Sequence, residues 1–171
     1  FFSGAMGFSV NSTNPSAPLP VSLQAGSQTP ILLWESTYAN TGSWSNDILP
    51  VDVESDRQNN TYVLSLKGGV STQTNILLLK YDRKGILLWE KEYDGGYAGP
   101  GVSSLDVPTE LGFDSRGNIY VAGTSRGFSY ETNTPTYDDF VLLKYDRLGN
   151  QLWVQRYNGS GNSTDQVKGI G

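Results

Sequence analysis

The sequence contains neither cysteine nor histidine. The lack of cysteine excludes a disulfide framework and thiolate metal sites, although it is compatible with any compartment. The lack of histidine excludes Ser-His-Asp and Cys-His catalysis and imidazole metal ligands. A catalytic site could use only carboxylates, Tyr, Lys and Arg, and the sequence predicts no cofactor and no metal.

Strong charge of one sign and long apolar runs are also missing. Twelve basic residues stand against seventeen acidic ones, for a net charge of -5, and no Lys/Arg cluster stands out. Nucleic acid is therefore not an expected partner. No apolar run approaches the ~20 residues of a membrane span. The 171 residues are instead rich in Gly, Tyr, Asn, Ser and Thr, which suits short strands joined by many turns.

The chain repeats itself. Three tryptophans, 55 and 64 residues apart, are each followed at the same distance by a tyrosine. The pairs are Trp34 and Tyr38, Trp89 and Tyr93, and Trp153 and Tyr157. A period of this length indicates a repeat architecture. A residue that every repeat requires is typically a packing element, so we expect these tryptophans to pack between repeats.

Each repeat reads as four short strands. The first unit has strand patterns at 47–55, 60–66, 75–82 and 86–93, and the second at 105–113, 118–124, 140–145 and 151–157. The turns at 56–60, 82–85, 114–118 and 146–150 place Gly or Asn where a tight hairpin needs a positive φ. Such short connections predict antiparallel neighbours.

The runs 76–79 and 140–143 are apolar at every position, which predicts sheets that are buried on both faces. Four-stranded antiparallel sheets covered by their neighbours are blades of a β-propeller. We therefore predict an all-β fold with blades at about 47–93 and 105–157. Single orphan strands are expected at 31–38 and 165–171, so that residues 31–171 form a partial propeller.

Two families resemble these repeats. Asp114–Thr124, Asp139–Asp146, Gly149 and Trp153 resemble the bacterial β-propeller repeat called SBBP, and the similarity extends over roughly residues 31–171. This resemblance implies a secreted or surface-attached scaffold or adhesin without assigned catalysis. Lys84–Trp89 is similar to the end of a quinoprotein-type propeller repeat. The motifs of both families are mainly structural, so neither implies a functional residue.

Residues 1–30 form a separate N-terminal segment. It has no charged residue, four prolines and three phenylalanines, namely Phe1, Phe2 and Phe8. One interpretation is a disordered leader. The other is an extended arm that docks on a neighbouring subunit, because a solvated tail has little reason to carry three Phe and no charge. The second interpretation predicts self-association or a protein partner.

Ligand-binding candidates are few. Trp44 lies outside the repeat pattern and is the best candidate for stacking on a ligand. Asp138 and Asp139 are paired carboxylates, the residue type that glycoside chemistry requires. Asp52, Glu54 and Asp56 alternate along one strand face, but they lack the spacing of a calcium loop. Asp139 stands at a strand start, where a backbone-bonding role is expected.

Four asparagines begin Asn-x-Ser/Thr sequons and are candidates for glycosylation. Three lie in predicted turns or loops and one in the N-terminal segment. They are Asn11, Asn59, Asn158 and Asn162.

The number of predicted blades bears on function. Two blades cannot close a ring that typically needs about four to eight. We expect either a part of a longer propeller, which the usual length of repeat proteins favours, or partial propellers that complete one another between chains. The predicted function is a non-catalytic extracellular or cell-surface module in adhesion or structural assembly. The alternative is a carbohydrate-binding or quinoprotein-like enzymatic propeller, of which this chain is a part.

Overall fold

In the computed structural model the described part of the chain consists of strands joined by turns and short irregular segments. The residues that the structure describes are 7–9, 19–20, 22–24, 34–38, 48–68, 74–96, 105–129, 134–160, 163–165 and 168–169. At 7–9, 19–20, 22–24, 127–129 and 134–136 the description covers the backbone alone. Over these ranges there is no helix, so none that is long and apolar enough to cross a membrane.

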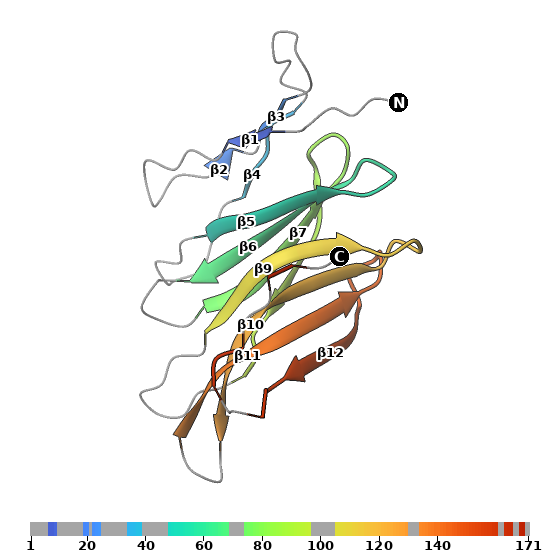
Figure 1. Cartoon of the computed structure of the whole chain (residues 1–171). Helices are drawn as coiled ribbons and strands as arrows, with labels where there is room; N and C mark the ends of the chain where they lie inside the picture. Colours follow the sequence, from blue (N-terminus) through green and yellow to red (C-terminus); the bar gives the residue numbers. More distant parts are fainter. Residues whose placement is uncertain are drawn as a thin grey trace.

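Two four-stranded antiparallel sheets make up most of the fold (Figure 1). The first sheet, blade 1, consists of β5 (Ile48–Ser55), β6 (Thr61–Gly68), β7 (Thr74–Tyr81) and β8 (Leu87–Tyr93). The second, blade 2, consists of β9 (Asp106–Phe113), β10 (Ile119–Ser129), β11 (Thr134–Tyr145) and β12 (Gln151–Tyr157). In both sheets each strand pairs with its neighbour in sequence. The predicted all-β fold of four-stranded antiparallel sheets is confirmed, and two sheets agree with two blades. Closure of a ring stays a prediction.

A carboxylate holds each of the four hairpin turns that the structure describes. Asp114 Oδ1 accepts the backbone N–H groups of Arg116 and Asn118, each at 2.9 Å, and its Oδ2 accepts the side-chain amide of Asn118 at 2.6 Å. Gly117 supplies the positive φ of 78° that the turn requires. Asp56, Asp82 and Asp146 bond their own turns in the same manner, except that Ile86 stands where the other turns have Asn. The repeated Asp-x-x-Gly-Asn pattern therefore stabilises the turn through contacts between residues that are close in sequence.

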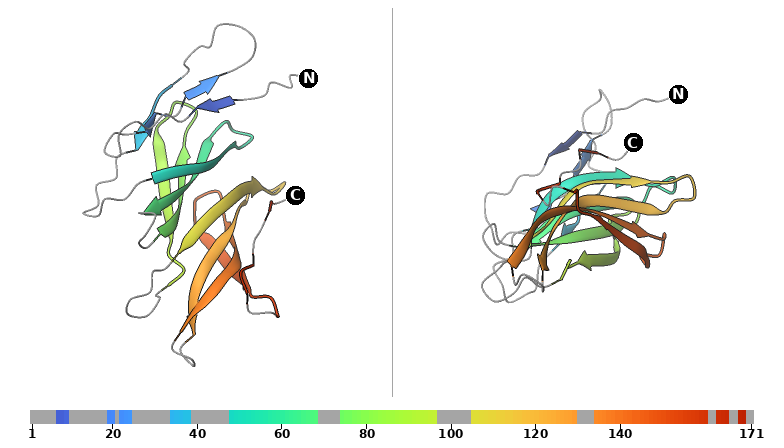
Figure 2. Two further views of the ribbon diagram at one scale, coloured as in Figure 1. Left: turned by 60° about the vertical axis from the view of Figure 1, so that its left-hand side comes forward. Right: turned by 60° about the horizontal axis from the view of Figure 1, so that its bottom comes forward.

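The main core lies between the blades. Strand β9 lies against β5, β6 and β7, and Figures 1 and 2 show the two sheets side by side. The buried residues of blade 1 in this core are Tyr62, Leu64, Ile76, Leu78 and Tyr93. Those of blade 2 are Leu111, Ile119, Val121, Val141, Leu143 and Tyr145. A smaller core covers the opposite face of blade 1, where Trp34 and Tyr38 pack against Val63, Leu77, Leu79 and Tyr81.

The two apolar runs differ in burial. Ile76–Leu79 in β7 are each at most 3% exposed, because both faces of blade 1 are covered. In β11, Val141 and Leu143 are buried at 0% exposure, whereas Phe140 and Leu142 on the other face are half-buried. No described sheet covers that outer face of blade 2 (Figure 2).

Strands β10 and β11 run past their predicted ends at 124 and 140. The antiparallel pairing continues to Ser129 and Thr134, with a register shift between Arg126 and Phe128. A cross-strand ion pair between Arg126 Nε and Asp138 Oδ1, at 2.8 Å, stabilises this extension.

Short strands precede blade 1. Strand β1 (Gly7–Ser9) pairs with β3 (Ser22–Gln24), and β2 (Leu19–Pro20) pairs with β4 (Thr37–Tyr38). Phe8 lies in β1, while Phe1 and Phe2 lie outside the described residues. Of the strand expected at 165–171, the structure describes 165, 168 and 169, which have no strand assignment, and the prediction for the others falls outside the described residues.

Candidate inter-blade site

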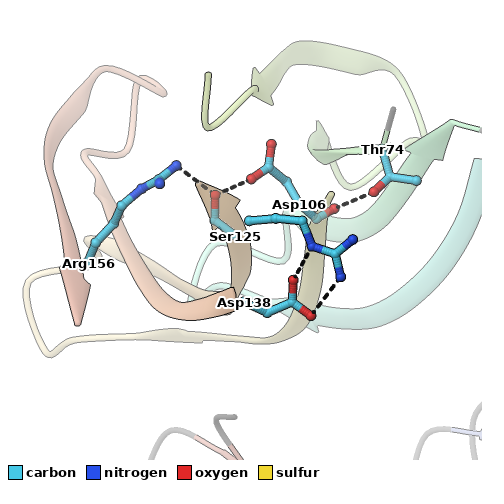
Figure 3. Close-up of polar contacts among 6 residues, drawn as sticks. Thr74, Asp106, Ser125, Asp138 and Arg156 are labelled. Carbon is cyan, nitrogen blue, oxygen red and sulfur yellow. Dashed lines mark hydrogen bonds and ion pairs between the residues drawn. The ribbon is translucent and has the colours of Figure 1, made fainter. Parts of the chain in front are cut away.

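A polar cluster connects the blades at one edge of their interface (Figure 3). Asp106, the first residue of β9, is fully buried. Its Oδ2 accepts the backbone N–H of Gly95 from blade 1 at 2.7 Å, and its Oδ1 accepts the hydroxyl of Ser125. The Thr74 hydroxyl of blade 1 donates to the Asp106 carbonyl at 3.2 Å. One carboxylate therefore joins both sheets.

Arg156 closes this cluster from β12. Its Nη2 donates to Ser125 Oγ and to the Gly95 carbonyl, each at 2.6 Å, and to the Tyr93 hydroxyl at 3.1 Å. Two of these partners, Tyr93 and Gly95, lie at the end of β8 and two residues beyond it in blade 1. The arginine thus spans the interface and places a positive charge beside the buried Asp106 carboxylate.

Burial raises the pKa of Asp106, although the Gly95 N–H, the Ser125 hydroxyl and the Arg156 charge act in the opposite direction. Burial also raises the pKa of Asp139. Asp139 Oδ1 is enclosed and makes no hydrogen bond within the described part of the chain. Asp106 is 0% exposed, so it cannot reach a substrate in solution. The chemistry that this cluster supports is the joining of two sheets.

A second repeated arrangement surrounds a lysine in each blade. The Lys80 amino group lies 5.0 Å from the ring centre of Tyr62 and 5.8 Å from that of Trp89, in a cation–π arrangement. It donates to the Arg147 carbonyl of blade 2 at 3.0 Å. Burial lowers the pKa of Lys80. This lysine is therefore a further contact between the blades.

The corresponding set in blade 2 is Tyr120, Lys144 and Trp153. The Lys144 amino group lies 4.7 Å from the ring centre of Tyr120 and 6.0 Å from that of Trp153. It donates to the Tyr120 hydroxyl at 2.6 Å and lies 3.6 Å from Asp114 Oδ2. The hydrogen bond to Tyr120 raises the pKa of Lys144. The Lys-Tyr-Asp-Arg repeat in the sequence reflects this shared arrangement.

Turn glycines receive the repeated tryptophans. A Cβ atom at Gly149 in blade 2 would lie 3.1 Å from the Trp89 ring of blade 1 and 2.7 Å from Lys91 Cε. A Cβ atom at Gly85 in blade 1 would lie 2.5 Å from the Trp34 ring. Each of these two tryptophans therefore packs against the last turn of the following sheet, and only glycine leaves it the room.

A pocket of about 380 Å³ lies at the turn end of the interface. Its lining residues come from the turns of both blades: Ser55, Asp56, Arg57, Gln58, Phe113, Asp114, Ser115, Gly117 and Arg147. The two aspartates already bond their own turns. Hydrogen bonding, first of all from the Asn118 side chain, lowers the pKa of Asp114 to about 2. The pocket therefore holds carboxylates that stay ionised, beside two arginines and one aromatic ring.

The candidates expected from the sequence are scattered. Asp52 accepts the Val53 N–H at 2.8 Å and the Leu111 N–H of blade 2 at 2.9 Å, Asp56 bonds its own turn, and Asp138 pairs with Arg126. Within the described ranges, no three Asp, Glu, His or Cys side chains are grouped so that they could hold a metal ion. Asn59 and Asn158 are exposed, whereas Trp44, Asn11 and Asn162 lie outside the described residues.

Four residues of the polar cluster were not singled out by the sequence: Gly95, Asp106, Ser125 and Arg156. They are up to 61 residues apart along the chain, and their contacts depend on how the two sheets meet. One clue is present, because a glycine follows each of Trp89 and Trp153 at the same distance, at Gly95 and Gly159.

A comparison with known protein families supports the presence of a repeat in this chain. The family model described as SBBP, a beta-propeller repeat, matches residues 97–129. This segment contains β9 and β10 of blade 2, and the predicted resemblance to SBBP-type repeats is confirmed there. A search of curated proteins finds no match.

Proposed function

We propose that this chain is a non-catalytic β-propeller repeat module of a secreted or surface-attached protein, with a role in adhesion or structural assembly. One observation carries the proposal. The positions that recur between repeats are engaged in contacts from one sheet to the next. Trp89 packs on Gly149, Lys80 donates to the Arg147 carbonyl, and Asp106 accepts from Gly95.

Two of the three aspartates that could suggest catalysis have structural partners. Asp106 is enclosed, and Asp138 forms an ion pair with Arg126. Asp139 is 9% exposed and faces the interface rather than solvent. The proposed secreted or surface location rests on the resemblance to SBBP repeats, which implies such proteins.

A screen against chromogenic glycosides tests the non-catalytic assignment. The full chain is expected to release no chromophore above the buffer blank. Turnover that disappears in Asp139→Asn and persists in Asp146→Asn, whose carboxylate belongs to an exposed turn, would show that the interface is an active site. That result would overturn the proposal. Surface labelling of intact source cells tests the location, since a surface protein is labelled without lysis.

The pocket at the turns favours a second candidate function, the binding of a sugar or a similar polar ligand. Phe113 offers an apolar surface, and Arg57 and Arg147 offer donors beside it. A glycan array separates the candidates. Binding that is lost in Arg57→Ala and retained in Arg83→Ala, a substitution in a turn outside the pocket, would establish a carbohydrate-binding module.

A further inference from the structure

The first strand of blade 2 is attached to blade 1 by a pair of hydrogen bonds that we call the clamp. The backbone N–H of Gly95, two residues after the end of β8, donates to Asp106 Oδ2 at 2.7 Å. The Thr74 hydroxyl at the start of β7 donates to the Asp106 carbonyl at 3.2 Å. The clamp places Asp106 at the edge of blade 1, and β9 begins there.

A similar clamp is present on blade 2, with donor and acceptor reversed in the second hydrogen bond. The backbone N–H of Gly159, two residues after the end of β12, donates to Asp165 Oδ2 at 2.6 Å. The Asp165 N–H donates to the Asp138 carbonyl at 2.8 Å. Gly159 and Asp138 each follow Gly95 and Thr74 by 64 residues, which is the spacing of Trp89 and Trp153. Asp165 therefore occupies on blade 2 the place that Asp106 occupies on blade 1.

A carboxylate of each blade also lies near the segment that follows the clamp aspartate. Asp52 in β5 of blade 1 accepts the N–H of Leu111, five residues after Asp106. Glu110 holds the matching position in blade 2, since Asp52 pairs with Leu64 and Glu110 with Ala122 in the second strand of each sheet. A Cβ atom at Gly169, four residues after Asp165, would lie 2.9 Å from Glu110 Oε2.

The face of blade 2 beside this clamp carries residues equivalent to those that blade 1 presents to blade 2. Tyr120, Leu142, Lys144, Trp153 and Tyr157 repeat Tyr62, Leu78, Lys80, Trp89 and Tyr93. Tyr93 is 9% exposed under blade 2, whereas Tyr157 is 62% exposed. Leu78 is 1% exposed, whereas Leu142 is half-buried. What covers this face in blade 1 is known: a further sheet of the same repeat.

We propose that Asp165 begins a third unit of the same repeat and that this unit docks on the open face of blade 2. The inference rests on the proposed function as an assembly module and names the partner: a four-stranded sheet with the apolar pattern of Val121, Val141 and Leu143. It also carries a turn glycine that receives Trp153, as Gly149 receives Trp89, and a turn carbonyl that accepts from Lys144. Blade 1 of a second copy does not fit, because Trp34 and Tyr38 already cover its corresponding face.

The test adds the partner and measures the exposure of position 157. Residues 106–160 are repeated after residue 164, in place of 165–171, so that Asp106 of the added copy falls at the clamp. Since the chain has no cysteine, Tyr157→Cys introduces a single thiol for a colorimetric thiol reagent. The thiol is expected to react rapidly in the 171-residue chain and at least about tenfold more slowly in the extended one. Tyr93→Cys in the 171-residue chain is the control for a covered position.

Three outcomes overturn the proposal. They are an extension that adds no strand signal in circular dichroism, a folded extension that leaves the labelling rate at position 157 unchanged, and a 171-residue chain whose labelling slows as protein concentration rises. The last would show that a second copy covers the face. Replacing the clamp aspartate of the extended chain by Ala is expected to restore part of the rapid labelling. Labelling reports docking alone, so glycoside turnover would refute the proposed function without affecting this result.

Discussion

Replacing Tyr93 by Ala should weaken blade packing far more than the same change at Tyr157. The two tyrosines hold the same repeat position at the ends of β8 and β12, but their exposures are 9% and 62%. The pair therefore compares one residue type in one local setting, with and without a neighbouring sheet. Local strand propensity is nearly matched between the two sites.

The difference in burial sets the magnitude. A tyrosine buries about 200 Å² when fully enclosed, and the two sites differ in exposure by about half of that, so about 100 Å². At about 25 cal/mol per Å² this amounts to about 2.5 kcal/mol in the free energy of unfolding. The hydrogen bond from Arg156 to the Tyr93 hydroxyl adds about 1 kcal/mol, which Tyr93→Phe removes on its own.

Urea unfolding followed by circular dichroism measures these free energies. We expect Tyr93→Ala to be about 2.5 to 4 kcal/mol more destabilising than Tyr157→Ala, with equal urea slopes. Equal losses for the two variants would mean that blade 2 does not cover Tyr93 in solution.

Three further predictions concern the remaining contacts, and the first two are measured by the same urea assay. Trp89→Ala should lower the free energy of unfolding by about 3 kcal/mol. Trp153→Ala should lower it clearly less, because no described turn glycine lies against Trp153. Equal losses would contradict the role of Trp89 between the blades. Gly149→Ala should destabilise the fold by at least about 1 kcal/mol, because Gly149 has a φ of 82° and an added Cβ would crowd the Trp89 ring. Gly112→Ala should be less destabilising, because the space around Gly112 is open. Hydrogen bonding lowers the pKa of Asp114 from 3.8 to about 2, so the ionised carboxylate stabilises the folded state. This stabilisation is fully present above pH 3.8 and is lost as the pH falls towards 2. Asp114→Asn should therefore flatten the fall in melting temperature between pH 4 and pH 2, and an unchanged pH profile would exclude this role.

Local patterns predicted the strands and turns well. The turn at 114–118 is specified by its own residues, since the three hydrogen bonds that hold Asp114 in the turn come from groups within four positions of it. The apolar run 76–79 predicted a sheet covered on both faces, and Ile76–Leu79 are buried as expected. Such features depend on neighbours in sequence and on the two-residue period of a strand, so they can be predicted from the sequence alone.

Contacts between sheets could not be predicted in the same way. Arg156 and Tyr93 are 63 residues apart, and no local pattern indicates that they meet. The extension of β10 and β11 depends on the cross-strand pair of Arg126 and Asp138, which exists only once the register is set. The polar cluster was not predicted because its charged residues, Asp106 and Arg156, cannot be distinguished in the sequence from surface residues. They meet only when the two blades pack side by side.

A double-mutant cycle between Tyr93 and Arg156 tests whether blade 2 packs on blade 1 in solution. The variants are Tyr93→Phe, Arg156→Gln and the double substitution, each measured by urea unfolding. We expect a coupling free energy of about 1 kcal/mol or more, because the hydroxyl and the guanidinium meet across the interface at 3.1 Å. Effects that add to within about 0.3 kcal/mol would show that the two side chains do not meet and that the blades do not pack in this way.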